Sequence, residues 1–421
     1  MLKLLRLLLA SFVALALPFA SAAESGGAGA RWVATWATAS KTQTIFDRPL
    51  PTLRDVTLRQ IVRVSAGGSR ARVWLTNESG TEPLHVAAAT LALQDAGASI
   101  VPGSLRSLTF GGASAIAIAP GARAVSDPVE LRFGDRANLA ISTYLPGDLT
   151  SGTSPVTYHV RALQTNHHAS GDQSSATHLS GALTETSWFF LAGVDVAANP
   201  ATWGVVAVGD SITDGDQLGF PDEPVDQNAR YTDFLAELLG RGRRGAVANA
   251  GISGNQVTRT FLGANLQARL DRDVLTQPGA THVIVTAGIN DIGLPTLLSV
   301  IGIPTPPIDE SEIIAGLQQV AARARARGLA VVGGTLSPSG GSLLPGYSGP
   351  EVEAKRQAVN AWIRTSRAFD AVADFDAVLR DPANPAVMTP ALSADGLHPN
   401  TDGYRAMAKE AAAALARVRR R

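Results

Sequence analysis

The second half of the chain alternates short apolar runs with longer amphipathic stretches. Continuous apolar runs of this length are typical of strands buried on both faces. They lie near residues 205–208, 246–249, 282–286, 330–334 and 371–375. Apolar residues at helical spacing predict the intervening helices, near 231–240, 313–327 and 352–365, with a last one from Tyr404. Strand and helix in alternation predict a parallel sheet that helices cover on both faces.

The region before Val196 follows a different rhythm, in which side chains alternate with period two between glycine-rich turns. Residues 71–76 alternate in this way directly after the Gly67-Gly68 turn, and residues 139–145 form a second such segment. No long helical stripe interrupts the region. We therefore expect an antiparallel β-sandwich-like domain of about eight strands in front of the α/β domain.

The length of the chain favours two domains, because 421 residues exceed what one hydrophobic core usually serves. The change of rhythm places an N-terminal β-domain at 31–198 and a second domain at 200–421, with Pro200 in the linker.

The first residues have the pattern of an export signal. Lys3 and Arg6 precede a leucine-rich run, and the small residues Ala20-Ser21-Ala22 follow it, which predicts a signal peptide at 1–22. The run is shorter than the ~20 residues of a membrane-spanning helix. With no cysteine in the chain, neither lipid attachment at a cysteine nor a disulfide is expected. We expect a secreted or periplasmic protein without a membrane span once the signal is removed.

The overall charge gives no indication of a nucleic-acid partner. Basic and acidic residues balance at 36 each. The basic cluster Arg417, Arg419, Arg420 and Arg421 ends the last predicted helix, where the helix dipole favours cations.

Four short blocks carry the candidate chemistry. The first is Gly209-Asp210-Ser211, which breaks a β-branched run as a strand does when it delivers a serine to a turn. The other three blocks follow downstream as Gly251-Ile252-Ser253-Gly254-Asn255, Gly288-Ile289-Asn290-Asp291 and Asp395-Gly396-Leu397-His398-Pro399. The first three blocks each follow a predicted strand, so they are expected to converge at the carboxyl edge of the sheet.

These blocks resemble the GDSL, or SGNH, hydrolase family, from about Trp203 to the C-terminus. The resemblance implies a flavodoxin-like three-layer α/β/α fold and an ester hydrolase. It implies Ser211, Asp395 and His398 as catalytic residues, and Ser211, Gly254 and Asn290 as the oxyanion hole. The stretch with Trp32 to Trp36 and Val73 to Glu78 is similar to the non-catalytic N-terminal region of a secreted subset of the family.

The residue types suit this chemistry. A serine hydroxyl becomes nucleophilic when a base takes its proton, and an aspartate three residues before His398 can orient the imidazole locally. The alternative for the block from Asp395 to Pro399 is a loop without catalytic function that leads into the final helix, which Asn400 or Thr401 caps. The chain has no G-x-S-x-G elbow, which disfavours the α/β-hydrolase fold.

The other two blocks suit stabilisation of an oxyanion. A glycine at 254 allows close backbone approach, and Asn290 offers an amide N–H. The alternative for Asn290 is an Asx turn. We interpret Asp210 and Asp291 as groups that brace these loops.

No metal or cofactor site is expected. His167 and His168 are adjacent and point apart in a strand, and no further ligand recurs around them at metal-ligand spacing. The histidines at 85, 159, 178 and 282 are isolated.

Two loops are expected to shape substrate choice. Residues 294–308 are apolar and proline-rich, and residues 337–349 are rich in Gly, Ser and Pro. The alternative for the first is a short helix packed into the core. The N-terminal domain is expected to border the cleft through loops around Trp32 to Trp36.

The sequence thus predicts an exported serine esterase that acts on an ester substrate, removing acetyl or another short acyl group, including from an acylated polysaccharide. Two alternatives stay open. One is a lipase or arylesterase acting on lipids or small esters, and the other is a carbohydrate-binding protein with an inactive hydrolase domain.

Overall fold

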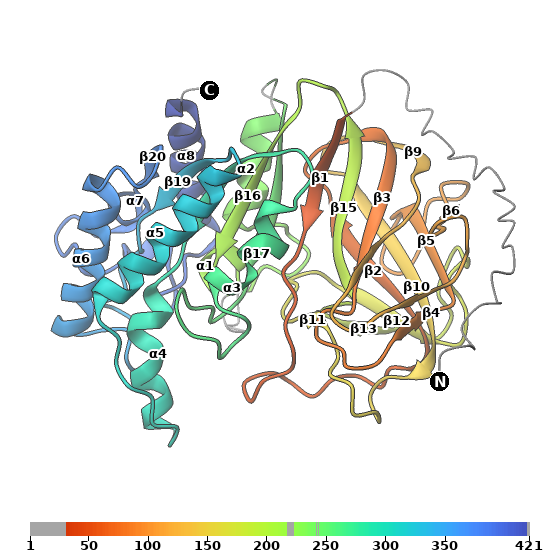
Figure 1. The fold of residues 1–421 in the computed structure, drawn as a ribbon, viewed down its shortest axis with the longest axis horizontal. Helices are drawn as coiled ribbons and strands as arrows, with labels where there is room; N and C mark the ends of the chain where they lie inside the picture. Colours follow the sequence, from red (N-terminus) through yellow and green to blue (C-terminus); the bar gives the residue numbers. More distant parts are fainter. Residues whose placement is uncertain (1–30, 217–222, 241, 243, 419–421) are drawn as a thin grey trace, which may run out of the picture.

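The chain forms a β-rich N-terminal domain and an α/β C-terminal domain that lie side by side (Figure 1). The structure is a computed structural model that describes residues 31–216, 223–240, 242 and 244–418. The expected signal peptide at 1–22 lies outside the described residues.

A five-stranded parallel sheet forms the centre of the C-terminal domain. Its strands are β16 (Trp203–Gly209), β17 (Gly245–Gly251), β18 (Ala280–Thr286), β19 (Ala330–Gly334) and β20 (Ala371–Ala373). The helices are α1 (Ser211–Asp214), α2 (Tyr231–Gly240), α3 (Leu266–Leu270), the π-helix η1 (Asp271–Leu275), α4 (Ile289–Val300), α5 (Glu310–Ala326), α6 (Pro350–Thr365), α7 (Phe375–Leu379), the 3₁₀ helix η2 (Pro390–Leu392) and α8 (Thr401–Arg417).

Helices cover both faces of this sheet, which confirms the predicted α/β/α layering. Val206 and Val208 pack with residues of α5 and α6, whereas Val205 and Ala207 pack with residues of α2 and α8. The side chains of one strand thus alternate between two apolar cores, which explains why these strands are apolar throughout.

The strand order places the candidate site. In the order β17-β16-β18-β19-β20 the first strand along the chain, β16, lies between the second and the third. This is the flavodoxin-like order, and its crevice for ligands lies where the order reverses, at the carboxyl ends of β16 and β18. Ser211 follows β16 and Asn290 follows β18, so both lie at that point.

The N-terminal domain is built on two antiparallel sheets. One has five strands in the order β1-β15-β3-β8, with β9 also paired to β3, and the other has six in the order β13-β12-β2-β10-β5-β6. The bounds are β1 (Arg31–Ala37), β2 (Arg54–Arg63), β3 (Gly68–Thr76), β4 (Leu84–Val86), β5 (Ala88–Leu93), β6 (Arg106–Ser107), β7 (Ile116–Ile118), β8 (Arg123–Val125), β9 (Val129–Phe133), β10 (Asn138–Asp148), β11 (Tyr158–His159), β12 (Asn166–Ser170), β13 (Leu183–Glu185), β14 (Trp188–Phe189) and β15 (Leu191–Ala198).

The β-rich architecture is as predicted, but the expected count of about eight strands was too low. The described part of this domain has strands β1 to β15. The excess consists of strands of two or three residues such as β6, β11 and β14. Segments this short contain too few residues for an alternation to be recognised.

The two domains meet along the edge strand β17. Ala34 and Ala37 of β1 pack against Ala248. The hydroxyl of Ser65 accepts a hydrogen bond of 2.9 Å from the backbone N–H of Val247. The N-terminal domain therefore covers an edge that would otherwise present unpaired backbone groups to solvent.

An ion-pair network also crosses this interface. The guanidinium of Arg123 lies 2.9 Å from both Glu78 and Asp273, and Asp273 pairs in turn with Arg269 at 3.2 Å. Burial alone would raise the pKa of Asp273. Arg272 and the other arginines lower this pKa by more, so that it lies well below the ordinary range of an aspartate. The carboxylate is ionised and bound on several sides.

Candidate active site

Ser211 is presented on a sharp turn at the end of β16. The strand ends at Gly209, and the side chain of Asp210 caps the following helix α1 by accepting a hydrogen bond of 3.0 Å from the N–H of Ile212. The helix ends after one turn at Gly215, in the left-handed conformation with φ +93°. The serine thus begins a helix whose two ends are fixed, and it lines a cavity.

The structure brings Ser211, His398 and Asp395 into one hydrogen-bonded chain. The hydroxyl of Ser211 lies 3.0 Å from Nε2 of His398. Nδ1 of the same ring lies 2.6 Å from Oδ2 of Asp395. All three residues are buried. An imidazole held by a carboxylate on one nitrogen and placed against a hydroxyl on the other can accept the hydroxyl proton.

Asp395 is fixed by more than the imidazole. Its Oδ1 accepts hydrogen bonds from the N–H groups of Leu397, at 2.9 Å, and His398, at 2.7 Å, and from the hydroxyl of Ser393 at 3.2 Å. Burial raises the pKa of Asp395, but His398 and the backbone N–H of Leu397 lower it more, to about 2. The carboxylate is therefore ionised at neutral pH.

The same block also precedes the final helix, as the alternative interpretation proposed. Oδ1 of Asn400 accepts from the N–H groups of Asp402 and Gly403 and so caps α8. The capping and the contact of His398 with Ser211 are compatible, because the cap begins two residues after the histidine.

Gly254 and Asn290 line the same cavity as Ser211. Gly254 has φ +74°, in the left-handed region that favours glycine, and a Cβ at this position would require the side chain of Leu262 to move. The Asn290 amide donates to the carbonyl of Asn255 at 3.2 Å and accepts from the hydroxyl of Tyr347 at 2.7 Å. An amide has two N–H groups, and the hydrogen bond to Asn255 uses one of them.

The two aspartates beside the site brace it, in agreement with the interpretation from the sequence. Asp291 accepts hydrogen bonds from the backbone N–H groups of Val257 and Thr258. It thereby ties the Asn290 turn to the loop that contains Gly254. Burial raises the pKa of Asp291, and it raises that of Asp210 to about 7.

The cavity over Ser211 has a volume of about 330 Å³ and receives residues from both domains. The N-terminal domain borders the cleft, as expected, but it does not do so through the tryptophans around Trp32 to Trp36. Trp36 packs against Trp188, and Trp74 donates to Asp195. The lining residues from the N-terminal domain are instead Lys41, Thr44, Phe46, Asp47, Val160 and Arg161.

Both candidate specificity loops reach the cavity, and one of them is partly helical. Residues 289–300 form α4, so the expected loop at 294–308 begins inside a helix, with Leu294 and Leu298 buried. Leu294 and Leu297 nevertheless line the cavity. The segment 337–349 has no helix or strand and contributes Leu344 and Tyr347.

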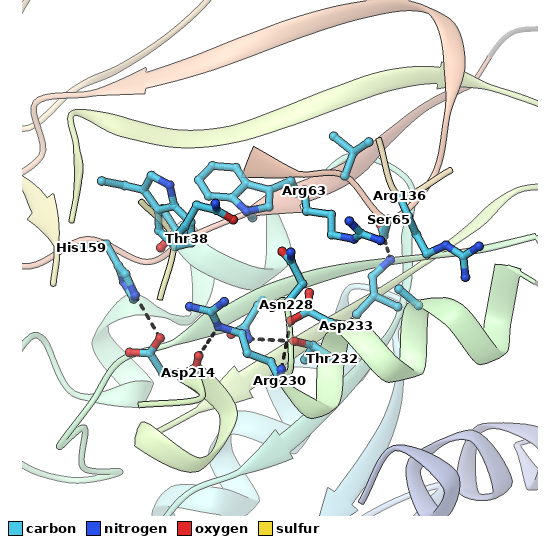
Figure 2. A pocket seen from close by; sticks show the side chains of 18 residues that line it. Thr38, Arg63, Ser65, Arg136, His159, Asp214, Asn228, Arg230, Thr232 and Asp233 are labelled. Carbon is cyan, nitrogen blue, oxygen red and sulfur yellow. Dashed lines mark hydrogen bonds and ion pairs between the residues drawn. The ribbon is translucent and has the colours of Figure 1, made fainter. Parts of the chain in front are cut away.

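His159 makes a contact with the serine turn that the sequence did not reveal. It reaches from β11 to Asp214, the last residue of α1, with 3.0 Å between Nε2 and Oδ1, and its Nδ1 lies 2.8 Å from the carbonyl of Ala39. The pair borders a small interdomain cavity, which Arg230 also lines (Figure 2). The volume of this cavity is about 50 Å³. Asp214 also accepts from the N–H of Ser253 at 3.1 Å, so the N-terminal domain helps to hold both the serine turn and the Gly254 loop.

Arg269 is the second residue that pattern reasoning missed. It is fully buried and donates to the carbonyls of Gly209 and Ala250 and to the side chain of Asn255. One guanidinium thus joins the ends of β16 and β17. A lone arginine in a polar stretch gives no sequence signal of such a role.

Within residues 31–216, 223–240 and 244–418, no helix is long and apolar enough to cross a membrane. The same part of the chain shows no group of three or more His, Cys, Asp or Glu residues that could hold a metal ion.

Comparison with solved structures finds similar chains that cover about half of this one. A catalytic mutant of an acetylxylan esterase from Geobacillus stearothermophilus is 22% identical, with 52% of this chain and 97% of that one covered and a TM-score of 0.39. A carbohydrate acetylesterase from Sinorhizobium meliloti is 15% identical, with coverages of 51% and 99% and a TM-score of 0.39. A GDSL-like lipase from Bacteroides thetaiotaomicron is 19% identical, with coverages of 51% and 87% and a TM-score of 0.36. None of the curated protein sequences matches the chain.

The family model of the GDSL-like lipases and acylhydrolases matches residues 207–406. That range begins inside β16 and ends inside α8, and it contains all four motif blocks. The C-terminal domain of this chain therefore belongs to the GDSL-like lipase/acylhydrolase family, and the protein is an ester hydrolase.

Proposed function

We propose that the protein hydrolyses acetyl or other short-chain acyl esters through a covalent acyl-enzyme on Ser211. The observation that carries this proposal is the continuous chain from Ser211 through His398 to Asp395, with 3.0 and 2.6 Å between the bonded atoms. In this proposal His398 takes the proton as Ser211 attacks the carbonyl carbon, and Asp395 stabilises the imidazolium that forms.

Negative charge then develops on the carbonyl oxygen. The backbone N–H groups of Ser211 and Gly254 and the amide of Asn290 are the donors that we assign to it. Collapse of the intermediate expels the alcohol, which receives the proton from His398. Water then attacks the acyl-enzyme with the same histidine as base, and the acid leaves.

The cavity supports a small acyl group. Its volume of about 330 Å³ holds a short acyl group together with part of an alcohol. An exported enzyme of this kind suits acylated polysaccharides, and we retain export and secretion or a periplasmic location as part of the proposal. The intact hydrogen-bonded chain disfavours a carbohydrate-binding protein with an inactive hydrolase domain.

One observation favours a second candidate, a lipase or arylesterase. The cavity wall formed by the catalytic domain is largely apolar, with Leu294, Leu297, Leu344 and Leu397. Such a wall suits a longer acyl chain or an aryl group because their contact removes apolar surface from water.

A substrate comparison tests both candidates. Acetate release from acetylated xylan and hydrolysis of nitrophenyl esters from acetate to octanoate are measured on the mature chain. The proposal expects the highest kcat/KM for acetate or the next longer chains, and the second candidate expects a maximum at medium length. Ser211→Ala should abolish all of these activities, by a factor on the order of 10⁶. A folded Ser211→Ala variant with a tenth of the activity would refute the mechanism.

A further inference from the structure

The cavity over Ser211 has two walls of different chemistry, one from each domain. On the catalytic domain, Leu297, Leu344 and Leu397 pack with Tyr347 in one apolar cluster. The lining residues of the N-terminal domain are mostly polar or charged. They include Lys41, Thr44, Asp47 and Arg161, and Asp216 of the catalytic domain lies beside them.

We propose that this polar wall is the subsite for the alcohol part of the ester. It takes a neutral polyhydroxylated alcohol such as a sugar unit, and Arg161 is its specificity-determining residue. The inference rests on the proposed serine esterase function, and it assigns to the N-terminal domain a role in choosing the substrate.

Lys41 and Asp47 form the closed part of the wall. Nζ of Lys41 lies 2.7 Å from Oδ2 of Asp47, and the two side chains are only 4% and 6% exposed. Asp47 also accepts from the N–H and the hydroxyl of Thr44, at 2.7 and 2.9 Å. These groups bind one another and give the wall a fixed shape.

Arg161 forms the open part. One of its N–H groups donates to Oδ1 of Asp216 at 3.1 Å, and the Arg161 side chain is 31% exposed whereas that of Asp216 is 1% exposed. A guanidinium has five N–H donors in a planar fork. Arg161 can thus keep its bond to Asp216 and donate to a ligand oxygen from the exposed side.

The charges on the wall indicate which ligand it fits. Two cations, Lys41 and Arg161, stand beside two carboxylates, Asp47 and Asp216. An anionic alcohol would approach the carboxylates together with the arginine, so repulsion offsets the attraction. An apolar alcohol would strip water from charged groups and return no hydrogen bond. A hydroxyl group carries no charge and can accept a hydrogen bond from the exposed N–H groups of Arg161, the open part of the wall.

The backbone around Arg161 is held in a conformation that few residues other than glycine adopt. Arg161 and Leu163 have φ of +55° and +50°. The segment is fixed on the catalytic domain at each side of them, by the bond of His159 to Asp214 and by the N–H of Asp226, which donates to the carbonyl of Leu163 at 3.0 Å. Strained backbone of this kind persists where the surroundings over-determine it, and it is frequent at ligand sites.

The test compares two acetyl esters that differ in the alcohol: acetylated xylo-oligosaccharide and nitrophenyl acetate. Arg161→Gln should lower kcat/KM for the sugar ester about ten- to hundred-fold, mainly by raising KM. A loss of this size corresponds to one hydrogen bond to a charged group. On nitrophenyl acetate it should stay within about threefold. Arg161→Lys keeps the positive charge but loses the planar fork of donors. Its kcat/KM for the sugar ester should lie between those of the wild type and Arg161→Gln. Arg132→Gln, at an exposed position of β9, is the matched control.

Three outcomes overturn the inference. They are equal losses on both esters with Arg161→Gln, no loss on either, and a wild-type enzyme that cleaves nitrophenyl acetate but no sugar acetate. Ser211→Ala keeps the two proposals apart. If Ser211→Ala retains activity, the serine mechanism fails whatever Arg161 does. If Ser211→Ala is inactive and Arg161→Gln is unselective, only the subsite fails.

Discussion

Replacing Asp395 by Asn tests the part of the proposed mechanism that depends most closely on geometry. The substitution keeps the size of the side chain and replaces one oxygen by an NH₂ group. Oδ1 accepts three hydrogen bonds, from two backbone N–H groups and Ser393, whereas Oδ2 faces only Nδ1 of His398. The amide of Asn should therefore keep its oxygen on the side with three donors and turn its NH₂ toward the imidazole.

That orientation forces the wrong tautomer on His398. With an N–H donor at Nδ1, the ring must accept there and hold its proton on Nε2, which lies 3.0 Å from the Ser211 hydroxyl and can then no longer take its proton. A serine triad with this substitution loses about 10⁴ in kcat. At 1.36 kcal/mol per tenfold, this is about 5.5 kcal/mol of transition-state stabilisation.

The assay is kcat and KM on nitrophenyl acetate, with urea unfolding to confirm the fold. Asp402→Asn, at an exposed position in the first turn of α8, is the matched control and should leave kcat unchanged. A folded Asp395→Asn enzyme that retains more than about a tenth of wild-type kcat would refute the reasoning, because a wrong tautomer cannot support turnover at that level.

Three further predictions concern the residues that hold the site. Tyr347→Phe removes the donor to Asn290 and should lower kcat about three- to tenfold with little change in KM, and an effect on KM alone in steady-state assays would contradict this positioning role. His159→Phe leaves the buried Asp214 without one of its partners and should lower the free energy of unfolding by about 1–3 kcal/mol, read from the urea midpoint; an unchanged midpoint would show the bond to be dispensable. Burial raises the pKa of Asp210 to about 7, above the ~3.9 of an unfolded chain, so the stability due to its neutral form is present below pH ~4 and is lost as pH rises through 7. Asp210→Asn cannot ionise and should therefore gain stability over the wild type across that window, by up to about 4 kcal/mol, and urea curves whose spacing does not change between pH 4.5 and 8 would contradict this.

Local pattern was sufficient for most of the catalytic domain. The apolar runs predicted strands that the structure has as β16 to β20, and helical spacing predicted α2, α5, α6 and α8. The reason is that these strands form the buried sheet and these helices pack on it. Which side chains are apolar therefore follows the period of the element, and this period can be recognised within one segment of the sequence. Pattern was weaker where elements are very short, as in β6 and β14, or where a proline argues against a helix that does form, as at Pro295 inside α4.

The sequence by itself determined the order of the elements and the four blocks that contain Ser211, Gly254, Asn290 and His398, since each block is contiguous and follows or precedes a recognisable element. The tertiary structure alone decided what supports these blocks. Tyr347 meets Asn290 across 57 residues, and His159 meets Asp214 across 55. Arg161 reaches the cavity from another domain. Such contacts arise when separate elements pack, and no periodicity within either partner encodes them, because a hydrogen bond between distant side chains leaves no trace in the local pattern of either segment.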